Sequence, residues 1–562
     1  MFGSNLRVAL TEVKAHPSAI MSFFVPASST ALVYTLCAIL VTLLLFFIVK
    51  LCTHRAQFLR MKRQGLPMPP YNPILGHLPV VINVMSSIPR DSHNQYLPGL
   101  LRRAYPYLGP NFYMDTWPFG SPVLFICEPI ALHQITQEHS LPKHPDLREF
   151  LRPLASGLDI VTMEGQQWKT WRNIFNPGFS LAHLMTLTPL IINETAILCD
   201  ILKERAEEGK IFAMKSLTDR WTMDIIGNVV LETNLNTQRA DNPMVNALKR
   251  QIRWLVFGSK LNPWERWHPF RSLVHRYCSQ QINSYINADL DRHIANLRLD
   301  TNTTSKSIVG LAMQTYLAED TSRKSIDDTF RVFALSQIKQ FLFSGHDTTS
   351  STMCYIFYVL SMNPGIKQRV EEEHNKLLGL TLESKSSRIQ EKPHLLNQLP
   401  YTTAVLKETM RLYPVASSLR GGEPGFCVRD PEGRSLPTDG FLVWAVSQPL
   451  HRDPDYWVRP ETFIPDRWLV DPDDPLYPIK GAWRPFEYGP RNCIGQELAM
   501  MELKVAMVFV LHMFDVEVAY VQFDLEKPKY PNTVSGERAY QLTLAGPSDG
   551  LPCKVKPKQA TA

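Results

Sequence analysis

The stretch FEYGPRNCIGQELAM runs from Phe486 to Met500 and places one cysteine, Cys493, in a loop directly before a helix-like segment. Gly489 and Gly495 flank this cysteine, and Arg491 precedes it by two residues. Unpaired N–H groups at a helix start stabilise a thiolate, and glycines let the backbone approach a flat ligand closely. The loop therefore suits a haem whose iron is bound by one cysteine, a ligand that favours O–O cleavage.

A lone Gly-x-x-x-Cys would more often be a buried cysteine in an ordinary glycine turn. Here the full pattern is Phe-x-x-Gly-x-Arg-x-Cys-x-Gly, formed by Phe486, Gly489, Arg491, Cys493 and Gly495. This pattern resembles the haem-binding signature of the cytochrome P450 family. The resemblance implies haem b (iron protoporphyrin IX) with Cys493 as axial ligand. Arg491 is then expected to neutralise a haem carboxylate, and Phe486 to cover the ring near the sulfur.

A second group of motifs predicts a structural network. KETMRLYP contains Glu408 and Arg411, which are three residues apart and so share a helix face. Such a pair alone is usually a solvated ion pair. In the family, however, it joins an arginine from another motif, matched here by Arg467 in FIPDRW. The resemblance therefore implies a buried network of these three residues that braces the haem region and takes no part in the chemistry.

WKTWR places Trp168 and Arg172 four residues apart on one face of an expected helix. The alternative interpretation is an amphipathic surface pair. The family resemblance implies instead that this pair contacts a haem carboxylate. Arg420, which follows the Glu408 helix, is a weaker candidate for the same role.

The stretch FLFSGHDTTSS, Phe341 to Ser351, lies in a long apolar helical pattern and resembles the oxygen-binding helix motif of the family. Gly345 is expected to open a notch for dioxygen, Thr348 to donate a hydrogen bond there, and Asp347 to feed protons through water. Ser344 stands where the family more often has Ala or Gly. The alternative is a capping or turn cluster, because Asp and Thr favour such positions.

Composition excludes several other classes of protein. The nine cysteines are scattered and contain no Cys-x-x-Cys pair, which argues against a disulfide framework or a structural zinc site and favours a reducing compartment. With 44% apolar and 20% charged residues the chain is globular. A net charge of +6 over 562 residues gives no indication of nucleic-acid binding.

The segment Ala31 to Val49 is uncharged and long enough to span a bilayer almost completely. A buried core helix and a cleaved signal peptide are the alternatives. We expect a lumenal segment at 1–30, an anchor helix at 31–50, a basic and Pro-rich linker at 51–75 and a catalytic domain at 76–562. Basic residues after the apolar run predict that the catalytic domain lies in the cytosol. The family resemblance implies that the membrane is that of the endoplasmic reticulum.

The coarse pattern of the remainder is mainly α with a minor β-sheet region, consistent with the cytochrome P450 fold that the motifs imply. NFYMDTWPFGSPVLFICEP, Asn111 to Pro129, predicts a hairpin. Long helices are predicted over Leu181–Glu208 and Asp327–Met362. Further strands are predicted near Phe441–Ser447 and Tyr540–Leu544.

The sequence contains no convincing Gly-x-Gly-x-x-Gly, so the electrons must come from a partner. The resemblance implies NADPH–cytochrome P450 reductase. The substrate is expected to be small and apolar, with Ile338 and Phe341 in its pocket. The family pattern also places 158–160, 415–419 and 533–537 near this pocket.

Three functions compete. The first is a monooxygenase that uses O₂ to hydroxylate, desaturate or epoxidise its substrate. The second is a haem-thiolate isomerase or dehydratase without O₂, which would be expected to lose the Asp347–Thr348 pair. The third is a non-catalytic haem carrier or gas sensor. GLPMPPYNPILGHLP and the oxygen-helix stretch are similar to fungal secondary-metabolite members, such as those acting on aflatoxin and sterigmatocystin precursors, which suggests a polyketide or terpenoid substrate.

Overall fold

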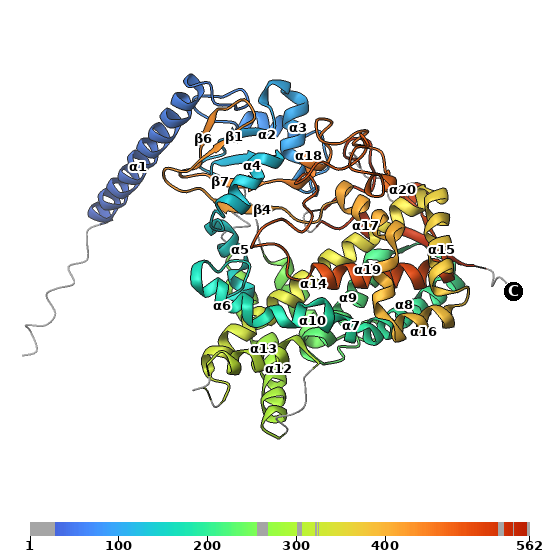
Figure 1. Ribbon diagram of the computed structural model, residues 1–562. Helices are drawn as coiled ribbons and strands as arrows, with labels where there is room; N and C mark the ends of the chain where they lie inside the picture. The colour runs from blue at the N-terminus through green and yellow to red at the C-terminus, as the bar shows by residue number, and fades with distance from the viewer. Residues whose placement is uncertain are drawn as a thin grey trace, which may run out of the picture. The chain divides into compact units, whose positions relative to one another are not determined.

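The computed structural model describes residues 29–255, 268–299, 306–320, 323, 325–526, 533–542 and 545–558. It divides into two compact units, Met1–Met61 and Lys62–Ala562. Figure 1 shows both units, coloured from the N-terminus to the C-terminus. All but the last two residues of the predicted lumenal segment, 1–30, lie outside the described residues.

Helix α1 (Ser29–Arg63) contains the predicted anchor and is long and apolar enough to cross a membrane. It does not end at residue 50, where the linker was expected to begin. Lysine and arginine are good helix formers, so the basic flank continues the helix. The helix ends ahead of Gly65, which has a positive φ of 77°, and Pro67. The first part of the expected linker is therefore helical.

The second unit is built mainly from helices. Its longest described helices are α8 (Thr188–Glu208), α9 (Met214–Leu231), α12 (Arg271–Leu299), α14 (Asp328–Met362) and α19 (Gln496–Met513). Shorter helices are α2 (Leu78–Met85), α3 (Tyr96–Ala104), α4 (Pro129–His133), α5 (Pro145–Ala155), α6 (Gly165–Phe175), α7 (Leu181–Thr186), α10 (Pro243–Arg253), α13 (Ile308–Ala318), α15 (Pro364–Leu378), α16 (Leu382–Glu391), α17 (Pro400–Leu412), α18 (Ser447–His451) and α20 (Tyr520–Glu526).

The strands form small sheets. The largest described sheet has the order β1 (Asn111–Met114), β2 (Val123–Ile126), β7 (Leu442–Ala445) and β4 (Ser418–Gly421). A second sheet joins β3 (Phe212–Ala213), β9 (Pro552–Pro557) and β8 (Phe514–Val518), and β5 (Cys427–Arg429) pairs with β6 (Ser435–Pro437). The antiparallel β1–β2 pair confirms the predicted hairpin, and β7 confirms the strand predicted near 441–447. The mainly α fold with minor sheets is thus confirmed.

Two predicted elements differ from the structure. The helix predicted over 181–208 is two helices, α7 and α8, and the chain bends by 70° between the helical stretch Gly165–Thr186, which ends with α7, and α8. Pro189 in the first turn of α8 explains the break, since proline cannot continue a helix through its own position. The strand predicted over 540–544 reduces to isolated bridges at Gln541 and Leu542, with 543–544 outside the described residues.

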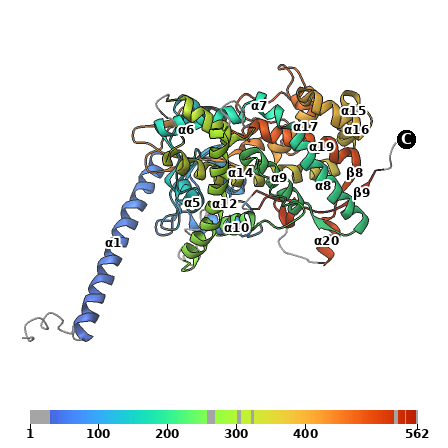
Figure 2. The same ribbon diagram turned by 90° about the horizontal axis from the view of Figure 1, so that it is seen from below.

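Helix α14 runs through the core and begins where the sequence predicts. The Asp327 carboxylate caps it by accepting a hydrogen bond from Phe330 N–H. Figures 1 and 2 both place α14 beside α9. A Cβ on Gly345 of α14 would lie 2.8 Å from the Ile226 side chain of α9, closer than atoms can pack. Glycine at this position therefore lets the two helices cross at short range.

Candidate functional site

The cysteine loop, α6, α14 and the segment before β4 border one cavity of about 310 Å³ in the second unit. Many of the residues singled out in the sequence line it: Trp168, Arg172, Phe341, Gly345, Thr348, Phe486, Arg491, Cys493 and Gly495. Segments far apart in the chain thus converge on one site, and Cys493 shares it with Thr348.

The loop around Cys493 holds its sulfur toward the cavity. The Cys493 N–H donates to the Phe486 carbonyl over 2.9 Å, and Asn492 N–H donates to the Gly489 carbonyl over 3.1 Å. The cysteine lies deep in the fold, yet its side chain is exposed to the cavity. Burial raises the pKa of the Cys493 thiol, while a hydrogen bond from the Gly495 backbone and the charge of Arg172 act in the opposite direction. The loop therefore offers partial support to a thiolate, which a metal cation would complete.

The two glycines of the loop serve different purposes. Gly489 has a φ of 86°, and a Cβ there would approach the Thr136 carbonyl oxygen to 2.4 Å. This glycine packs the loop against the chain after α4, which differs from the expected approach to a macrocycle. Gly495 lines the cavity, and the nearest atom to its hypothetical Cβ is Phe179 Cε1 at 4.0 Å. Of the two glycines, only Gly495 is thus placed to let the backbone approach a flat ligand in the cavity.

Side chains of helix α6 contact the cysteine loop directly. Arg172 Nη1 donates to the Asn492 carbonyl over 3.0 Å, and its Nη2 donates to Asn492 Oδ1 over 3.3 Å. The Arg491 guanidinium stacks 4.5 Å from the centre of the Trp168 ring. It also forms an ion pair with Glu164 Oε2 at 2.8 Å. Arg491 thus already has one carboxylate partner, and its contact with a haem carboxylate remains a prediction.

Lys143 is a candidate that the sequence reasoning missed. Its ammonium lines the cavity and donates to Ser418 Oγ over 3.2 Å. Burial, together with the charges of Arg420 and Arg491, lowers the pKa of Lys143 to about 7. No motif surrounds this lysine in the sequence, so only its place in the fold identifies it.

Arg420 does not line the cavity but lies immediately behind this lysine. It is completely buried and donates to Ser418 Oγ over 3.1 Å and to the Leu141 carbonyl over 2.9 Å. Its Nη2 has no hydrogen-bond partner within the described chain, and burial lowers its pKa to about 10. Lys143 and Arg420 therefore form a wall of incompletely compensated positive charge. This wall fits the two carboxylates of a haem.

The predicted Glu408 network is present in the geometry that the motifs imply. Glu408 accepts from Arg411 at 2.8 Å and from Arg467 at 3.1 Å, and all three side chains are completely buried. Arg411 also donates to the His451 carbonyl over 2.7 Å, and His451 Nε2 accepts from the Arg484 N–H over 2.9 Å. Since Arg484 lines the cavity, the network connects to the wall of the site.

The oxygen-helix motif divides between two cavities. Thr348 lines the first cavity, and its hydroxyl donates to the Ser344 carbonyl over 2.7 Å. Asp347 borders instead a second cavity, also about 310 Å³, together with Asp219, Lys249 and His346. A helix turns about 100° per residue, so neighbours in the sequence face different directions. Asp347 is thus adjacent to Thr348 in the chain but does not face Cys493.

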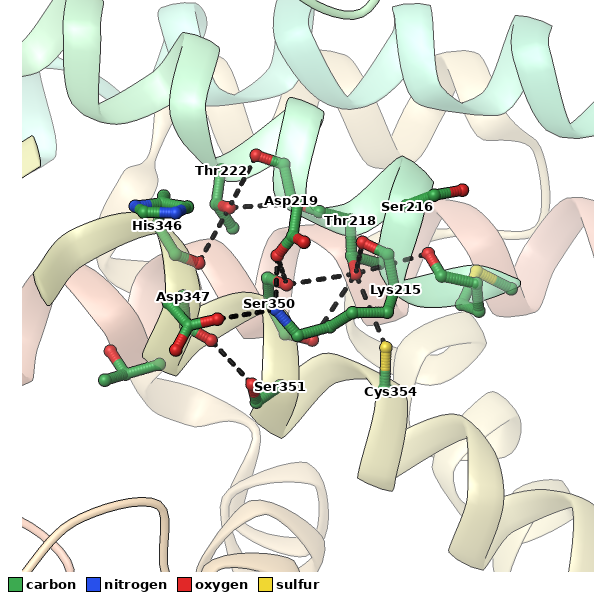
Figure 3. A network of polar contacts seen from close by, with 12 residues as sticks. Lys215, Ser216, Thr218, Asp219, Thr222, His346, Asp347, Ser350, Ser351 and Cys354 are labelled. Carbon is green, nitrogen blue, oxygen red and sulfur yellow. Dashed lines mark hydrogen bonds and ion pairs between the residues drawn. The ribbon is translucent and has the colours of Figure 1, made fainter. Parts of the chain in front are cut away.

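Figure 3 shows what holds Asp347. Lys215 extends from α9, and its Nζ donates to Asp347 Oδ1 over 2.7 Å. The same ammonium pairs with Asp219, which also accepts a hydrogen bond from Ser350. Burial alone would lower the pKa of Lys215, but Asp347 and Asp219 outweigh it and raise that pKa. No sequence motif predicts this pairing, because Lys215 and Asp347 lie on different helices.

A buried carboxyl group was also missed. Glu502 of α19 lines the first cavity, and burial raises its pKa well above the usual range, opposed by the Thr349 hydroxyl. Its Oε2 has no hydrogen-bond partner in the described part of the chain. Burial therefore favours the neutral form of the Glu502 carboxyl group, which lies beside Thr349, the residue after Thr348.

Some of the residues predicted for the substrate pocket line the first cavity and others do not. Phe341 lines the cavity, with its ring 5.1 Å from that of Phe179 and 5.3 Å from that of Phe175. Ile338 is fully buried and is not part of the described lining, because the Phe341 ring occupies the wall one turn closer to Gly345. Ile160 and 415–418 line the cavity, whereas 533–537 do not among the residues described.

Comparison with known proteins identifies the family. A family model described as cytochrome P450 matches residues 39–544. The chain belongs to the cytochrome P450 family. Cytochrome P450 monooxygenase polC of Polytolypa hystricis is 40% identical over 530 residues, covering 92% of this chain and 94% of that protein. Cytochrome P450 monooxygenase acrF of Aspergillus aculeatus is 32% identical, covering 85% and 100%. Cytochrome P450 3A2 of Rattus norvegicus is 26% identical, covering 85% and 90%.

As a cytochrome P450, the chain is a haem-thiolate monooxygenase, and its similar relatives are named as monooxygenases. The family implies a haem held by a cysteine thiolate, a redox partner, O₂ and an apolar substrate. The alternatives of an isomerase or dehydratase and of a non-catalytic haem protein are not supported by these relatives. The apolar α1 is compatible with a membrane anchor.

Proposed function

We propose that Cys493 is the axial ligand of haem b, iron protoporphyrin IX, in the first cavity. The observation that supports this proposal is that Cys493, Lys143 and Thr348 line one cavity, with the unpaired Arg420 guanidinium behind Lys143. A thiolate, a set of cations for two carboxylates and an oxygen-facing hydroxyl are what a P450 haem site needs.

Positively charged side chains would hold the haem carboxylates. They are those of Lys143, Arg172, Arg420 and Arg491. Phe486 would cover the ring near the sulfur, and Trp168 would pack beside Arg491 as it does now. Glu408, Arg411 and Arg467 would keep the surrounding chain rigid through their buried ion pairs.

Bound haem would supply the activation of dioxygen with two electrons from NADPH and two protons: in hydroxylation or epoxidation one oxygen atom would enter the substrate and the other leave as water, and in desaturation the substrate would lose two hydrogens and both oxygens would leave as water. Phe341 and Ile160 exclude bulk water from the apolar part of the cavity. The Thr348 hydroxyl would hold a proton at the Gly345 side of α14. Asp347 would supply protons from the second cavity when its carboxylate leaves Lys215.

The proposed enzyme is anchored by residues 31–50, with 1–30 in the lumen of the endoplasmic reticulum, 51–75 as linker and 76–562 in the cytosol. The uncharged 31–49 and the basic residues that follow support this orientation. NADPH–cytochrome P450 reductase of the same membrane would deliver the electrons.

The proposed substrate is a small apolar molecule of fungal secondary metabolism, which the enzyme hydroxylates, desaturates or epoxidises. The apolar lining supports this choice, as does the similarity to polC and acrF, both from fungi. The test is product analysis of the purified enzyme with reductase, NADPH and O₂, using the compound that accumulates in a deletion strain. NADPH consumption in proportion to an oxidised product is expected. Conversion of that compound without NADPH or O₂ would contradict the proposal.

A further inference from the structure

Gln340 on α14 lines the first cavity and has a side-chain oxygen without a hydrogen-bond partner in the described chain. The residue is only 3% exposed, and its Oε1 makes no hydrogen bond within the described chain. Buried amides are nearly always hydrogen-bonded, because leaving one unpaired is unfavourable. An orphaned amide at the wall of a ligand cavity therefore indicates that the partner comes with the ligand.

Gln337, one turn earlier on α14, differs from Gln340 because both polar atoms of its amide are paired. Gln337 Oε1 accepts from the Ile160 N–H over 2.9 Å, and Gln337 Nε2 donates to the Leu158 carbonyl over 2.6 Å. This glutamine is structural, since it fastens the chain before α6 onto α14. Gln340 makes neither kind of contact, so the fold of the described chain does not account for it.

Other hydroxyl groups of the cavity wall are already engaged. Ser344 Oγ donates to the Gln340 carbonyl over 2.7 Å, and Ser417 Oγ accepts from Trp444 Nε1 over 2.7 Å. Ser418 Oγ accepts from Lys143 and Arg420. Gln340 Oε1, like Glu502 Oε2 and Arg484 Nη1 of the same cavity wall, is instead unpaired within the described chain, and of these three residues Gln340 is the one on α14, beside the apolar Phe341.

The position of Gln340 also sets a distance. At 1.5 Å per residue, Gln340 lies about 7.5 Å from Gly345 and about 12 Å from Thr348 along the axis of α14. Phe341 and Ile160 line the cavity with it and are apolar. A ligand that extends from the Thr348 end and pairs with the Gln340 amide therefore has an apolar body with a polar group at one end.

We propose that Gln340 recognises one oxygen function, a hydroxyl or a carbonyl, on an otherwise apolar substrate. The axial separation of Gln340 from Gly345 and Thr348, about 7.5 to 12 Å, sets the scale of the distance between this oxygen and the carbon that is oxidised. The inference rests on the proposed function, which places the oxidation between Cys493 and Thr348. An amide donates through its nitrogen and accepts through its oxygen, and a rotation exchanges the two. Both a hydroxyl and a carbonyl can therefore be bound.

The test uses ligands that are anchored on the haem iron, so that binding does not depend on knowing the substrate. Imidazole nitrogen is a common metal ligand. A series of 1-alkylimidazoles with hexyl to dodecyl tails is compared with the same series ending in a hydroxyl or an aldehyde group. Dissociation constants are measured by spectral titration of the holoenzyme.

We expect one tail length at which an oxygen-terminated compound binds about 2- to 10-fold more tightly than its alkyl partner, the effect of one neutral hydrogen bond. In Gln340→Met this preference disappears, while the alkyl compound binds as before. In Gln340→Asn the preferred tail becomes longer, because the amide is withdrawn. A preference for hydroxyl or for aldehyde tells which atom of the amide faces the ligand.

Thermal unfolding separates recognition from structure. Gln340→Met should leave the melting temperature unchanged or raise it, whereas the matched control Gln337→Met should lower it. The proposal is overturned if no tail length shows a preference in the wild type, or if the preference survives in Gln340→Met. A purified protein that does not bind haem would instead contradict the proposed function. The failure of the inference and the failure of the proposed function are therefore distinguishable.

Discussion

The Lys215 ammonium on α9 lies 2.7 Å from the Asp347 carboxylate on α14, so the acid of the oxygen helix is tied to a neighbouring helix. Asp347 directly precedes Thr348, which lines the cavity of Cys493, yet Asp347 borders a separate polar cavity with His346 and Asp219. Any proton that Asp347 supplies must therefore come from this second cavity, and Lys215 controls where the carboxylate points.

Replacing Lys215 by methionine should destabilise the protein. The variant leaves Asp219 and Asp347 largely buried without their shared cation, which costs about 3 to 5 kcal/mol of unfolding free energy. Lys215→Arg keeps the charge and should retain most of the stability. Denaturant unfolding of both variants measures the difference. Equal stability of Lys215→Met and wild type would show that the ion pair is not needed for folding.

The same cluster predicts a dependence on acid pH. Burial would raise the pKa of Asp219, but the Lys215 charge and the hydrogen bonds dominate and lower it. A carboxyl whose pKa is lower in the folded state stabilises above its unfolded pKa of about 3.9 and loses that contribution as the pH falls through the folded value. Asp219→Asn should therefore weaken the acid dependence of stability below about pH 4. An unchanged pH profile would contradict this assignment.

Removing the thiol tests the iron ligand. Cys493→Ala should eliminate the red-shifted Soret band that the ferrous carbonyl form of a P450 shows, because no thiolate then reaches the iron. Circular dichroism should show unchanged helix content, since the Cys493 side chain faces the cavity. Absorbance of the reduced, carbon monoxide-treated protein measures the effect. A retained band would refute Cys493 as ligand.

Lys143 should make haem retention depend on pH. In the protein alone its pKa is about 7, lowered by burial and by Arg420 and Arg491. Haem carboxylates would raise that pKa, so haem binding takes up a proton and weakens as the pH rises above about 7. Competition with apomyoglobin for haem between neutral and alkaline pH measures this. Lys143→Met should bind haem more weakly, with a flatter pH profile, and an unchanged profile would contradict the role.

Thr348→Ala should uncouple electron consumption from product formation. The variant loses the hydroxyl that lines the cavity but keeps Cys493 and the cationic wall, so haem should remain bound. NADPH should then be consumed with more hydrogen peroxide and less oxidised product. Peroxide and product are measured per NADPH. Fully coupled turnover would count against a role of Thr348 in proton delivery.

Patterns confined to short stretches predicted their structures well. Asp327 marks the start of α14, Pro-Phe-Gly-Ser-Pro separates the two strands of the first hairpin, and the glycine-framed loop presents Cys493 to the cavity. Each depends on capping or turn chemistry within a few residues. Such chemistry is visible in the sequence.

Features that depend on distant segments were not predictable. Lys143 and Gln340 show no local motif, and their importance comes from burial at a shared cavity. The orientation of Asp347 depends on Lys215, which reaches it from another helix. Ile338 had the right periodicity for the pocket, but the larger Phe341 ring already forms that wall. Side-chain size and long-range pairing decide these cases.

The tight crossing at Gly345 and Ile226 carries a consequence for how this protein can change. A methyl group at 345 would lie 2.8 Å from the outer carbons of the Ile226 side chain, so alanine there requires that side chain to move or to become smaller. Because Ile226 also lines the cavity, either adjustment changes the space beside Thr348. A mutation in the oxygen notch is therefore coupled, through residue 226, to the shape of the ligand cavity.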